Sequence, residues 1–233
     1  MNALLKVEGL TAWYEAERPV LRDLSFTLQP HEVVGLIGLN GSGKTTLIKG
    51  LSGLLPTFRA DALTVHGAFL AVRDEAFKQQ RYMVFAEDQA FQYFTFREYL
   101  AYVCAAYRIP VPDVEKLVEG FHFAAYTDTM LCALSTGNRK KVFLITAFAL
   151  ELPLLIFDEP VNGLDFQSTE FLYQQIKAYR AVGTVFFSSH VLESLALTAD
   201  RVLVLTDGSI ARQFEPSTME AQAIREALNH GQF

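Results

Sequence analysis

The chain has 233 residues, of which 51% are apolar, and a formal net charge of −6. A chain of this length and apolar content can bury a sizeable core, and it suits one large α/β domain or two small ones. The acidic balance argues against a broad nucleic-acid-binding face, so no nucleic-acid partner is expected.

Cysteine usage and the first residues add two further expectations. Cys104 and Cys132 have neither metal-binding nor redox spacing, which favours reduced, buried thiols in a cytosolic protein. Lys6 and Glu8 fall among the first apolar residues, so we expect no secretory signal.

The first elements predicted in chain order are strands. Residues 3–8 and 20–28 have strand patterns on either side of a turn-like stretch at residues 15–19. Residues 63–72 form a further strand-like stretch, which Gly67 interrupts. We expect these segments to build a small antiparallel sheet.

A glycine-rich loop at residues 38–46, here called the phosphate loop, reads Gly-Leu-Asn-Gly-Ser-Gly-Lys-Thr-Thr. It follows a strand-like run at residues 33–37 and leads into Leu47, Ile48 and Leu51, whose spacing suits one face of a helix. The loop fits the phosphate-binding pattern of two glycines with four residues between them, then Lys and Ser/Thr. The strand before it and the helix after it argue against a glycine-rich turn that matches by accident.

Each residue type in the phosphate loop has a chemical reason. Glycines let the backbone curl so that successive N–H groups point at phosphate oxygens, and the helix N-terminus adds partial positive charge. Lys44 can reach the β- and γ-phosphates, and the Thr45 hydroxyl can ligate Mg²⁺. The predicted nucleotide-binding residues of this loop are Gly38, Asn40, Gly41, Ser42, Gly43, Lys44, Thr45 and Thr46.

Two aromatic residues, Trp13 and Tyr14, lie just ahead of the phosphate loop in the chain. An aromatic ring at this place could stack on a nucleotide base. Aromatic residues in β hairpins are more often packing residues, and spacing alone favours that interpretation.

The middle of the chain interrupts the alternation of strands and helices. A capping box at residues 95–98 starts a helix that runs to about residue 107, and residues 111–126 also look helical. We expect an inserted α-helical subdomain at about residues 88–150. Four aromatic residues crowd together at its start and form either ordinary core or a docking groove for a partner: Phe91, Tyr93, Phe94 and Phe96.

Residues 134–138, Leu-Ser-Thr-Gly-Asn, indicate a second anion-binding helix end and are called the signature segment below. Ser135 is a good N-cap for a helix that carries Arg139, Lys140 and Lys141 in its first turns. Positive residues at a helix N-terminus oppose the helix dipole, and an anion placed there would relieve the conflict. As a cap alone, Ser135 needs no further function.

An apolar stretch at residues 142–157 resembles a membrane span in hydropathy alone. It is too short to cross a bilayer, and Glu151 and Pro153 divide it. The sequence therefore predicts a buried helix to about residue 150 and then a short buried strand at residues 154–157.

Asp158 and Glu159 follow this strand at its C-terminal end, where ligands bind in open parallel sheets. In P-loop enzymes an acidic residue at this place holds Mg²⁺, a role we assign to Asp158. Because strand side chains alternate, Glu159 points elsewhere and is placed to deprotonate a water that attacks the γ-phosphate.

His190 follows another predicted buried strand, at residues 184–187. A lone His after a strand is more often structural than catalytic, but a strand C-terminus favours function. The remaining predicted elements are a strand at residues 82–86, a turn at 162–165, a helix at about 168–180, a strand at 201–205 and a terminal helix that starts at a capping box, 217–220.

These motifs together resemble the ATPase subunit of an ATP-binding cassette (ABC) transporter, from Trp13 to about Gly208. Five motifs fall in the order of that family: the phosphate loop, the signature segment, the carboxylate pair, an aspartate loop at residues 162–165 and a switch histidine at His190. The resemblance implies one ABC-type ATP-binding domain over residues 1–233. Its fold class is α/β, a P-loop NTPase core with a mostly parallel sheet, a small antiparallel β subdomain and the inserted helical subdomain.

The resemblance also implies roles that spacing leaves open. Tyr14 would stack on adenine, Ser135 and Gly137 would bind the γ-phosphate of an ATP held by the opposite subunit, and Asp165 of the aspartate loop would join the nucleotide site. Glu159 and His190 would be catalytic, with His190 contacting the γ-phosphate and the attacking water. The implied cofactors are ATP and Mg²⁺, with Thr45, Asp158 and Glu87 at the metal.

The implied partners are a second ATPase subunit, in a homodimer or a heterodimer, and a transmembrane permease subunit that docks near residues 91–96. Since each chain supplies a phosphate loop and a signature segment that cannot both reach one ATP, two copies would bury two ATP molecules between them. The chain would be cytoplasmic and peripheral on the cytoplasmic face of the membrane through its partner.

Several positions depart from the common pattern of the family. The signature segment has Thr136 and Asn138 where Gly and Gln are more frequent. His31 stands where Gly is usual, which costs strain if its φ is positive. At the loop position that contacts magnesium we align Glu87, although Gln89 is close enough to be the alternative.

Two classes of function are compatible with these motifs. The favoured one is a transporter subunit, and Glu87 and the Ser-Thr-Gly of the signature segment favour export. The alternative is an ABC ATPase that acts on ribosomes, DNA or iron–sulfur assembly. Such proteins typically carry two cassettes or long insertions, and neither is seen here.

Overall fold

The computed structural model describes residues 2–15, 18–86, 90–215, 223–224 and 226–227. The strands are β1 (Leu5–Glu15), β2 (Arg18–Leu28), β3 (Val33–Ile37), β4 (Phe58–Arg59), β5 (Ala62–Val65), β6 (Ala68–Phe69), β7 (Arg81–Val84), β8 (Leu154–Phe157), β9 (Thr184–Ser189), β10 (Arg201–Thr206) and β11 (Ser209–Phe214). The α-helices are α1 (Lys44–Ser52), α2 (Glu75–Lys78), α3 (Phe96–Tyr107), α4 (Glu115–Gly120), α5 (Thr136–Ala149), α6 (Phe166–Ala178) and α7 (Leu192–Thr198). Short 3₁₀ turns are η1 (Ala124–Tyr126), η2 (Leu131–Ala133) and η3 (Tyr179–Ala181).

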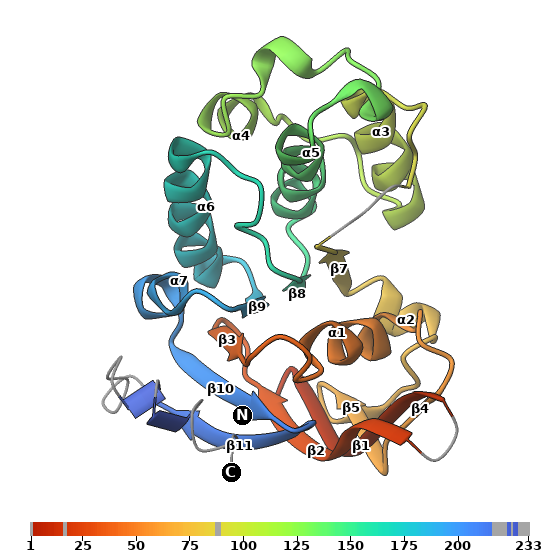
Figure 1. The fold of residues 1–233 in the computed structure, drawn as a ribbon. Coiled ribbons are helices and arrows are strands. Elements are labelled where there is room, and N and C mark those ends of the chain that lie inside the picture. The colour runs from red at the N-terminus through yellow and green to blue at the C-terminus, as the bar shows by residue number, and fades with distance from the viewer. Residues whose placement is uncertain (1, 16–17, 87–89, 216–222, 225, 228–233) are drawn as a thin grey trace.

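A six-stranded sheet in the order β11-β10-β3-β9-β8-β7 forms the centre of the molecule (Figure 1). All its pairings are parallel except that of β10 with β11. Every residue of β3, β8 and β9 is buried. Strands covered on both faces are expected to be continuous apolar runs, so the predicted P-loop core with a mostly parallel sheet is confirmed.

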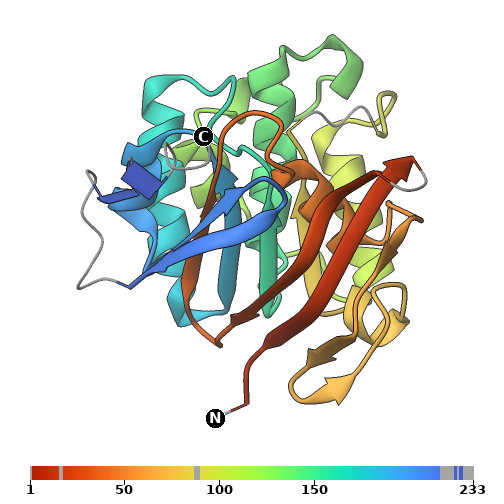
Figure 2. The same cartoon turned by 60° about the horizontal axis from the view of Figure 1, so that its bottom comes forward.

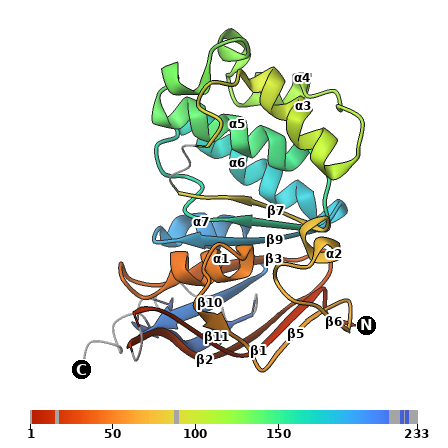
Figure 3. The same cartoon turned by 90° about the vertical axis from the view of Figure 1, so that its right-hand side faces the viewer.

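The two faces of this sheet pack into two different apolar cores. Along β8, Leu155 and Phe157 belong to the core shared with α3, α5 and α6, whereas Leu154 and Ile156 belong to the core shared with α1, β1 and β2. This follows from the alternation of strand side chains. Figure 3 shows the resulting layers: helices α3–α6 on one face of the sheet, α1 on the other, and a second sheet beyond α1.

The second sheet is antiparallel, with the order β2-β1-β5-β6 and with β4 also paired to β1. It confirms the predicted small β subdomain. β1 and β2 are longer than expected, since their pairing continues through register shifts to Glu15 and Arg18. In Figure 2 the β10–β11 hairpin lies beside β2, where Arg22 N donates to Gly208 O at 2.9 Å.

The helices over residues 88–150 confirm some boundaries and correct others. The capping box at Thr95 is present, and α3 ends at Tyr107 as predicted. The single helix expected over residues 111–126 is wrong, because α4 covers six residues and η1 three. His122 adopts a left-handed φ of 52°, which ends the helix and turns the fully buried Phe121 and Phe123 into the core.

The apolar stretch at residues 142–157 divides as predicted, into the buried helix α5 and the strand β8. No helix within the described ranges is long and apolar enough to cross a membrane. Cys104 is buried, but Cys132 is exposed, so the expectation of two buried thiols is wrong for Cys132. His31 has a left-handed φ of 62°, so the strain considered for a non-glycine residue at this position applies. The capping box predicted at residues 217–220 lies outside the described residues.

Candidate functional site

The phosphate loop joins β3 to α1, and its backbone depends on glycine at two positions. Gly41 and Gly43 have φ values of 85° and 108°, in the left-handed region where other residues are strained. A Cβ at Gly43 would also lie 2.6 Å from Cδ2 of Leu21 on β2. The loop therefore curls back over the N-terminus of α1, where free backbone N–H groups form an anion-binding end.

Lys44 opens α1 and is buried across this loop. Its Nζ donates to the main-chain oxygen of Gly38 at 2.8 Å and of Leu39 at 3.4 Å. The buried Ser42 Oγ has no hydrogen-bond partner within the described part of the chain. A cation and an unpaired hydroxyl in a loop of backbone donors fit an oxyanion ligand such as a nucleotide phosphate.

Thr45 and Asp158 supply oxygen ligands next to the phosphate loop. Thr45 Oγ1 donates to Asp158 Oδ2 at 2.8 Å, and Ser188 Oγ donates to Asp158 Oδ1 at 2.7 Å. Asp158 is only 1% exposed. Among the described residues no group of three or more His, Cys, Asp or Glu could hold a metal by itself. The donor set fits Mg²⁺, which is usually bound by one or two protein oxygens together with substrate phosphates and water.

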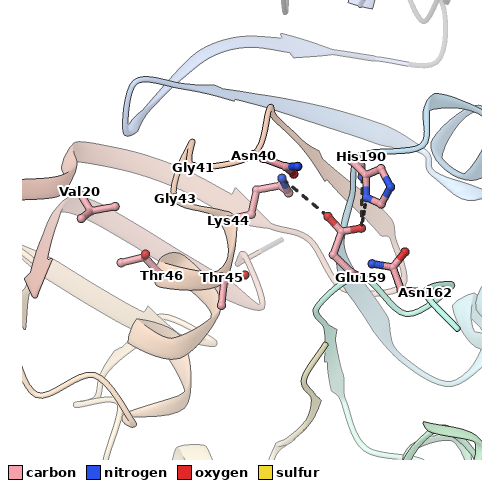
Figure 4. Close-up of a pocket in the computed structure, with 10 residues that line it drawn as sticks. All are labelled: Val20, Asn40, Gly41, Gly43, Lys44, Thr45, Thr46, Glu159, Asn162 and His190. Atoms are coloured by element: carbon pink, nitrogen blue, oxygen red, sulfur yellow. Dashed lines mark hydrogen bonds and ion pairs between the residues drawn. The ribbon is translucent and has the colours of Figure 1, made fainter. Parts of the chain in front are cut away.

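Glu159 and His190 meet on the other side of Lys44, as Figure 4 shows. Glu159 Oε2 lies 2.8 Å from His190 Nδ1 and Oε1 lies 3.7 Å from Lys44 Nζ. Glu159 itself is buried and has a left-handed φ of 48°. Because a carboxylate can only accept, Nδ1 of His190 carries the proton of this hydrogen bond.

These groups surround a cleft of about 510 Å³. Its lining combines predicted residues of the phosphate loop with Glu159 and His190: Val20, Asn40, Gly41, Gly43, Lys44, Thr45, Thr46, Glu159, Asn162 and His190 (Figure 4). Gly38, Ser42 and Asp158 lie immediately beside it through the bonds and loop geometry already described. The structure thus brings together residues that are more than a hundred positions apart in the chain.

The signature segment does not line this cleft. Ser135 is exposed and caps α5 by accepting from Asn138 N at 3.2 Å, as predicted. Gly137 packs against the aspartate loop, where a Cβ on it would lie 2.2 Å from the main-chain oxygen of Gly163. The N-terminus of α5 is therefore not part of the cleft beside the phosphate loop of its own chain.

Asp165 is also held within the chain rather than in the cleft. It accepts from Ser168 N at 2.8 Å, capping α6, and pairs with Lys141 Nζ at 2.7 Å. The hydrogen bond from Lys141, then that from the Ser168 backbone, holds the pKa of Asp165 well below its usual range. Asp165 therefore stays ionised and fixes the start of α6.

Tyr14 lies at the rim of the site. The Tyr14 ring is about half exposed and its hydroxyl lies 3.5 Å from Thr46 Oγ1. Glu87 and the alternative Gln89 lie outside the described residues.

Sequence reasoning missed Ser188, which bridges Asp158 and the Glu159 backbone, and Asn162, which lines the cleft. The only signal in the sequence is that Ser188 lies close to His190 and Asn162 lies close to the carboxylate pair.

The aromatic segment at residues 91–96 divides between surface and core. Phe91 contacts the rings of Phe94 and Tyr102 at centroid distances of 5.3 and 5.1 Å, and Tyr93 is 80% exposed. Phe96 is only 2% exposed, so it belongs to the core. Tyr93 and the half-exposed Tyr102 form the surface part, called the aromatic face below.

A glycine loop between a parallel strand and a helix, facing an acidic pair at the end of another buried strand of the same sheet, defines a P-loop nucleoside triphosphatase. The sequence model described as ABC transporter matches residues 21–162. With most of its length matched, the chain belongs to the ABC transporter family, and it is an ATP-binding subunit and ATPase of that family.

Known relatives cover nearly the whole chain. It is 32% identical over 217 residues to the putative ABC transporter ATP-binding protein AlbC of Bacillus subtilis, covering 90% of this chain and 91% of that protein. It is 31% identical to the SkfA peptide export ATP-binding protein SkfE of the same organism, covering 94% and 92%. A solved ATP-binding subunit of an ABC transporter superposes with a TM-score of 0.86 at 27% identity, covering 97% and 99%.

Proposed function

We propose that this chain hydrolyses Mg·ATP in the cleft, dimerises around two ATP molecules and drives a separate membrane subunit, in the direction of export. The observation that carries the hydrolytic part is the position of Glu159. Its carboxylate lies beside Lys44 of the phosphate loop and is hydrogen bonded to His190. A carboxylate in this place suits a general base for a water attacking the γ-phosphate.

The neighbouring residues take complementary roles. The phosphate loop from Gly38 to Thr46 cradles the phosphates, and Lys44 exchanges its main-chain partners for phosphate oxygens. Thr45 and Asp158 would hold Mg²⁺, which would neutralise the charge that develops on the phosphates. The hydrogen bond from Nδ1 to Glu159 orients the His190 ring, so its other ring nitrogen is the atom available to the γ-phosphate or the water.

The position of the signature segment supports the proposed dimer. Ser135 and Gly137 are outside the cleft of their own chain, yet they stand at a helix end with free N–H donors and no acidic residue in its first turn. A second copy related by a twofold axis can place its ATP against these donors. Each ATP is then part of the interface, and its hydrolysis loosens the dimer.

Two variants of Ser135 test this arrangement, because Asp and Asn are both good N-caps but differ by one charge. We expect Ser135→Asp to leave ATP affinity at the phosphate loop unchanged and to abolish ATP-dependent dimerisation, since a carboxylate meets the γ-phosphate. Ser135→Asn should still dimerise. Light scattering with saturating Mg·ATP measures this, in a background that does not hydrolyse ATP. Equal dimerisation of both variants contradicts the proposal.

We infer that the membrane subunit docks on the aromatic face. Exposed aromatic side chains such as Tyr93 and Tyr102 are typical anchors of protein interfaces. The chain would then sit on the cytoplasmic face of the membrane through this partner. The similarity to a peptide-export ATP-binding protein and the Ser-Thr-Gly of the signature segment support export.

A membrane pull-down tests the docking and separates transport from other functions. The protein should recover a multi-helix membrane protein. The double variant Tyr93→Glu with Tyr102→Glu should reduce the recovery by at least ~10-fold, which is the loss of binding expected when a modest interface anchor is removed. Phe69→Glu, an equally exposed aromatic on β6, is the matched control and should have no effect. Recovery of ribosomal or DNA-bound partners instead would favour the non-transport alternative.

A further inference from the structure

Two consecutive lysines in the first turns of α5, Lys140 and Lys141, are almost completely buried, at 4% and 3% exposure. Neither lines the ATP cleft. A buried ammonium group is costly unless it is paired and hydrogen bonded, so packing alone does not account for lysine at these positions. The contacts of the two ammonium groups indicate what they hold.

Both lysines bind the segment at residues 159–165, which connects β8 to α6. Lys140 Nζ donates to the main-chain oxygen of Glu159 at 2.9 Å, and Lys141 Nζ pairs with Asp165 Oδ2 at 2.7 Å. Between these two points Gly163 packs closely against Gly137. The segment is therefore tied at both ends and at one interior position to α5, the helix that begins at the signature segment.

The contact at Glu159 fixes an unusual backbone conformation. Glu159 has a left-handed φ of 48°, which persists in a non-glycine residue only where its surroundings hold it. Its N–H is bound by Ser188 Oγ at 2.9 Å, and its C=O is bound by Lys140. With both peptide groups held, the carboxylate is aimed at His190 and Lys44.

We propose that Lys140 is a positioning residue that holds the general base Glu159 by its main-chain carbonyl and ties it to the helix bearing Ser135 and Gly137. The inference rests on the role proposed for Glu159. It adds a direct connection between the two halves of the dimer: when the N-terminus of α5 engages the ATP of the second copy, a displacement of α5 reaches Glu159 of its own chain through Lys140.

Lys140→Met tests this by removing the donor while retaining the apolar length of the side chain. We expect kcat for ATP hydrolysis to fall on the order of 10²-fold, the size of a small misplacement of a catalytic group, with ATP affinity unchanged. In the E159Q background the same change should lower the residual turnover no further, because the base it positions is already absent. Phosphate release and ATP binding by all four proteins complete the cycle.

Lys141→Met is the matched control for loss of a buried lysine on the same helix. It removes the partner of Asp165, not of Glu159, so it should lower turnover by the same factor in the wild-type and E159Q backgrounds. Lys116→Met, at an exposed position on α4, should leave turnover unchanged.

The inference is overturned if Lys140→Met lowers turnover equally in both backgrounds, or if it leaves wild-type kcat unchanged. Should Lys140→Met not fold, Lys140→Leu is measured in its place, since it also removes the donor and keeps an apolar side chain, and the same two outcomes decide. A failure of the proposed function is distinguishable, because E159Q would then hydrolyse ATP at a near-normal rate irrespective of position 140.

Discussion

Lys44→Ala is expected to weaken ATP binding by roughly 10² to 10⁴-fold. Two charge-assisted hydrogen bonds to phosphate oxygens contribute about 1.5–3 kcal/mol each, and a factor of ten in affinity corresponds to about 1.4 kcal/mol. The Lys44 ammonium is already buried in the phosphate loop, so ATP binding costs little additional free energy for the desolvation of this side chain. Equilibrium binding of a fluorescent ATP analogue measures the change.

The control for Lys44 is Lys49→Ala, the same substitution five residues later on α1. Lys49 does not line the ATP cleft, so its loss should leave ATP affinity within about twofold, the usual range of a surface change. Thermal unfolding of both variants checks that the phosphate loop still folds without the bond from Lys44 to Gly38. Unchanged ATP affinity of Lys44→Ala in a folded protein overturns the assignment of the loop.

The sequence predicts those elements whose local pattern and tertiary position agree. β3, β8 and β9 are short apolar runs, and each ends at a chemically distinctive group, so their ends could be placed within two residues. The capping box at Thr95 and the N-cap at Ser135 are local side-chain hydrogen bonds, and both appear as predicted. In these cases no distant contact had to override local preference.

The errors arise where distant contacts decide. The helix predicted over residues 111–126 has a helical apolar stripe, but burial of Phe121 and Phe123 requires the turn at His122. For Phe96 the sequence leaves core and docking groove both open, and its burial together with its contact with Phe123, at 5.6 Å between ring centroids, assigns it to the core. Pairing between residues far apart in the chain is not encoded in a local pattern.

The same limit applies to the site. The phosphate loop and the carboxylate pair have spacing rules that follow from phosphate and magnesium chemistry, so sequence alone indicates them. No such spacing rule marks Ser188, Lys140 and Lys141. Their function depends on the position of a single side-chain atom, Oγ or Nζ, in the folded chain. Buried lysines beside a signature segment can be found only in three dimensions.

Glu159→Gln is expected to reduce ATP turnover by at least ~10²-fold, the range for loss of a general base. Glutamine has nearly the same shape and can accept the hydrogen bond that His190 donates from Nδ1, so the local geometry is retained. It cannot take a proton from water. ATP affinity should not fall, since the substitution removes a negative charge next to the triphosphate. Single-turnover phosphate release separates the chemical step from product release.

The same variant should accumulate as a dimer with saturating Mg·ATP, because ATP that is not cleaved remains between the two chains. Glu170→Gln, at an exposed position on α6, is the matched control: it should hydrolyse ATP at the wild-type rate and show no lasting dimer. Near-normal hydrolysis by Glu159→Gln removes Glu159 from the role of base. If Glu159→Gln remains monomeric under saturating Mg·ATP, both alone and beside the membrane partner, the shared ATP site is contradicted, because uncleaved ATP then does not hold two chains together.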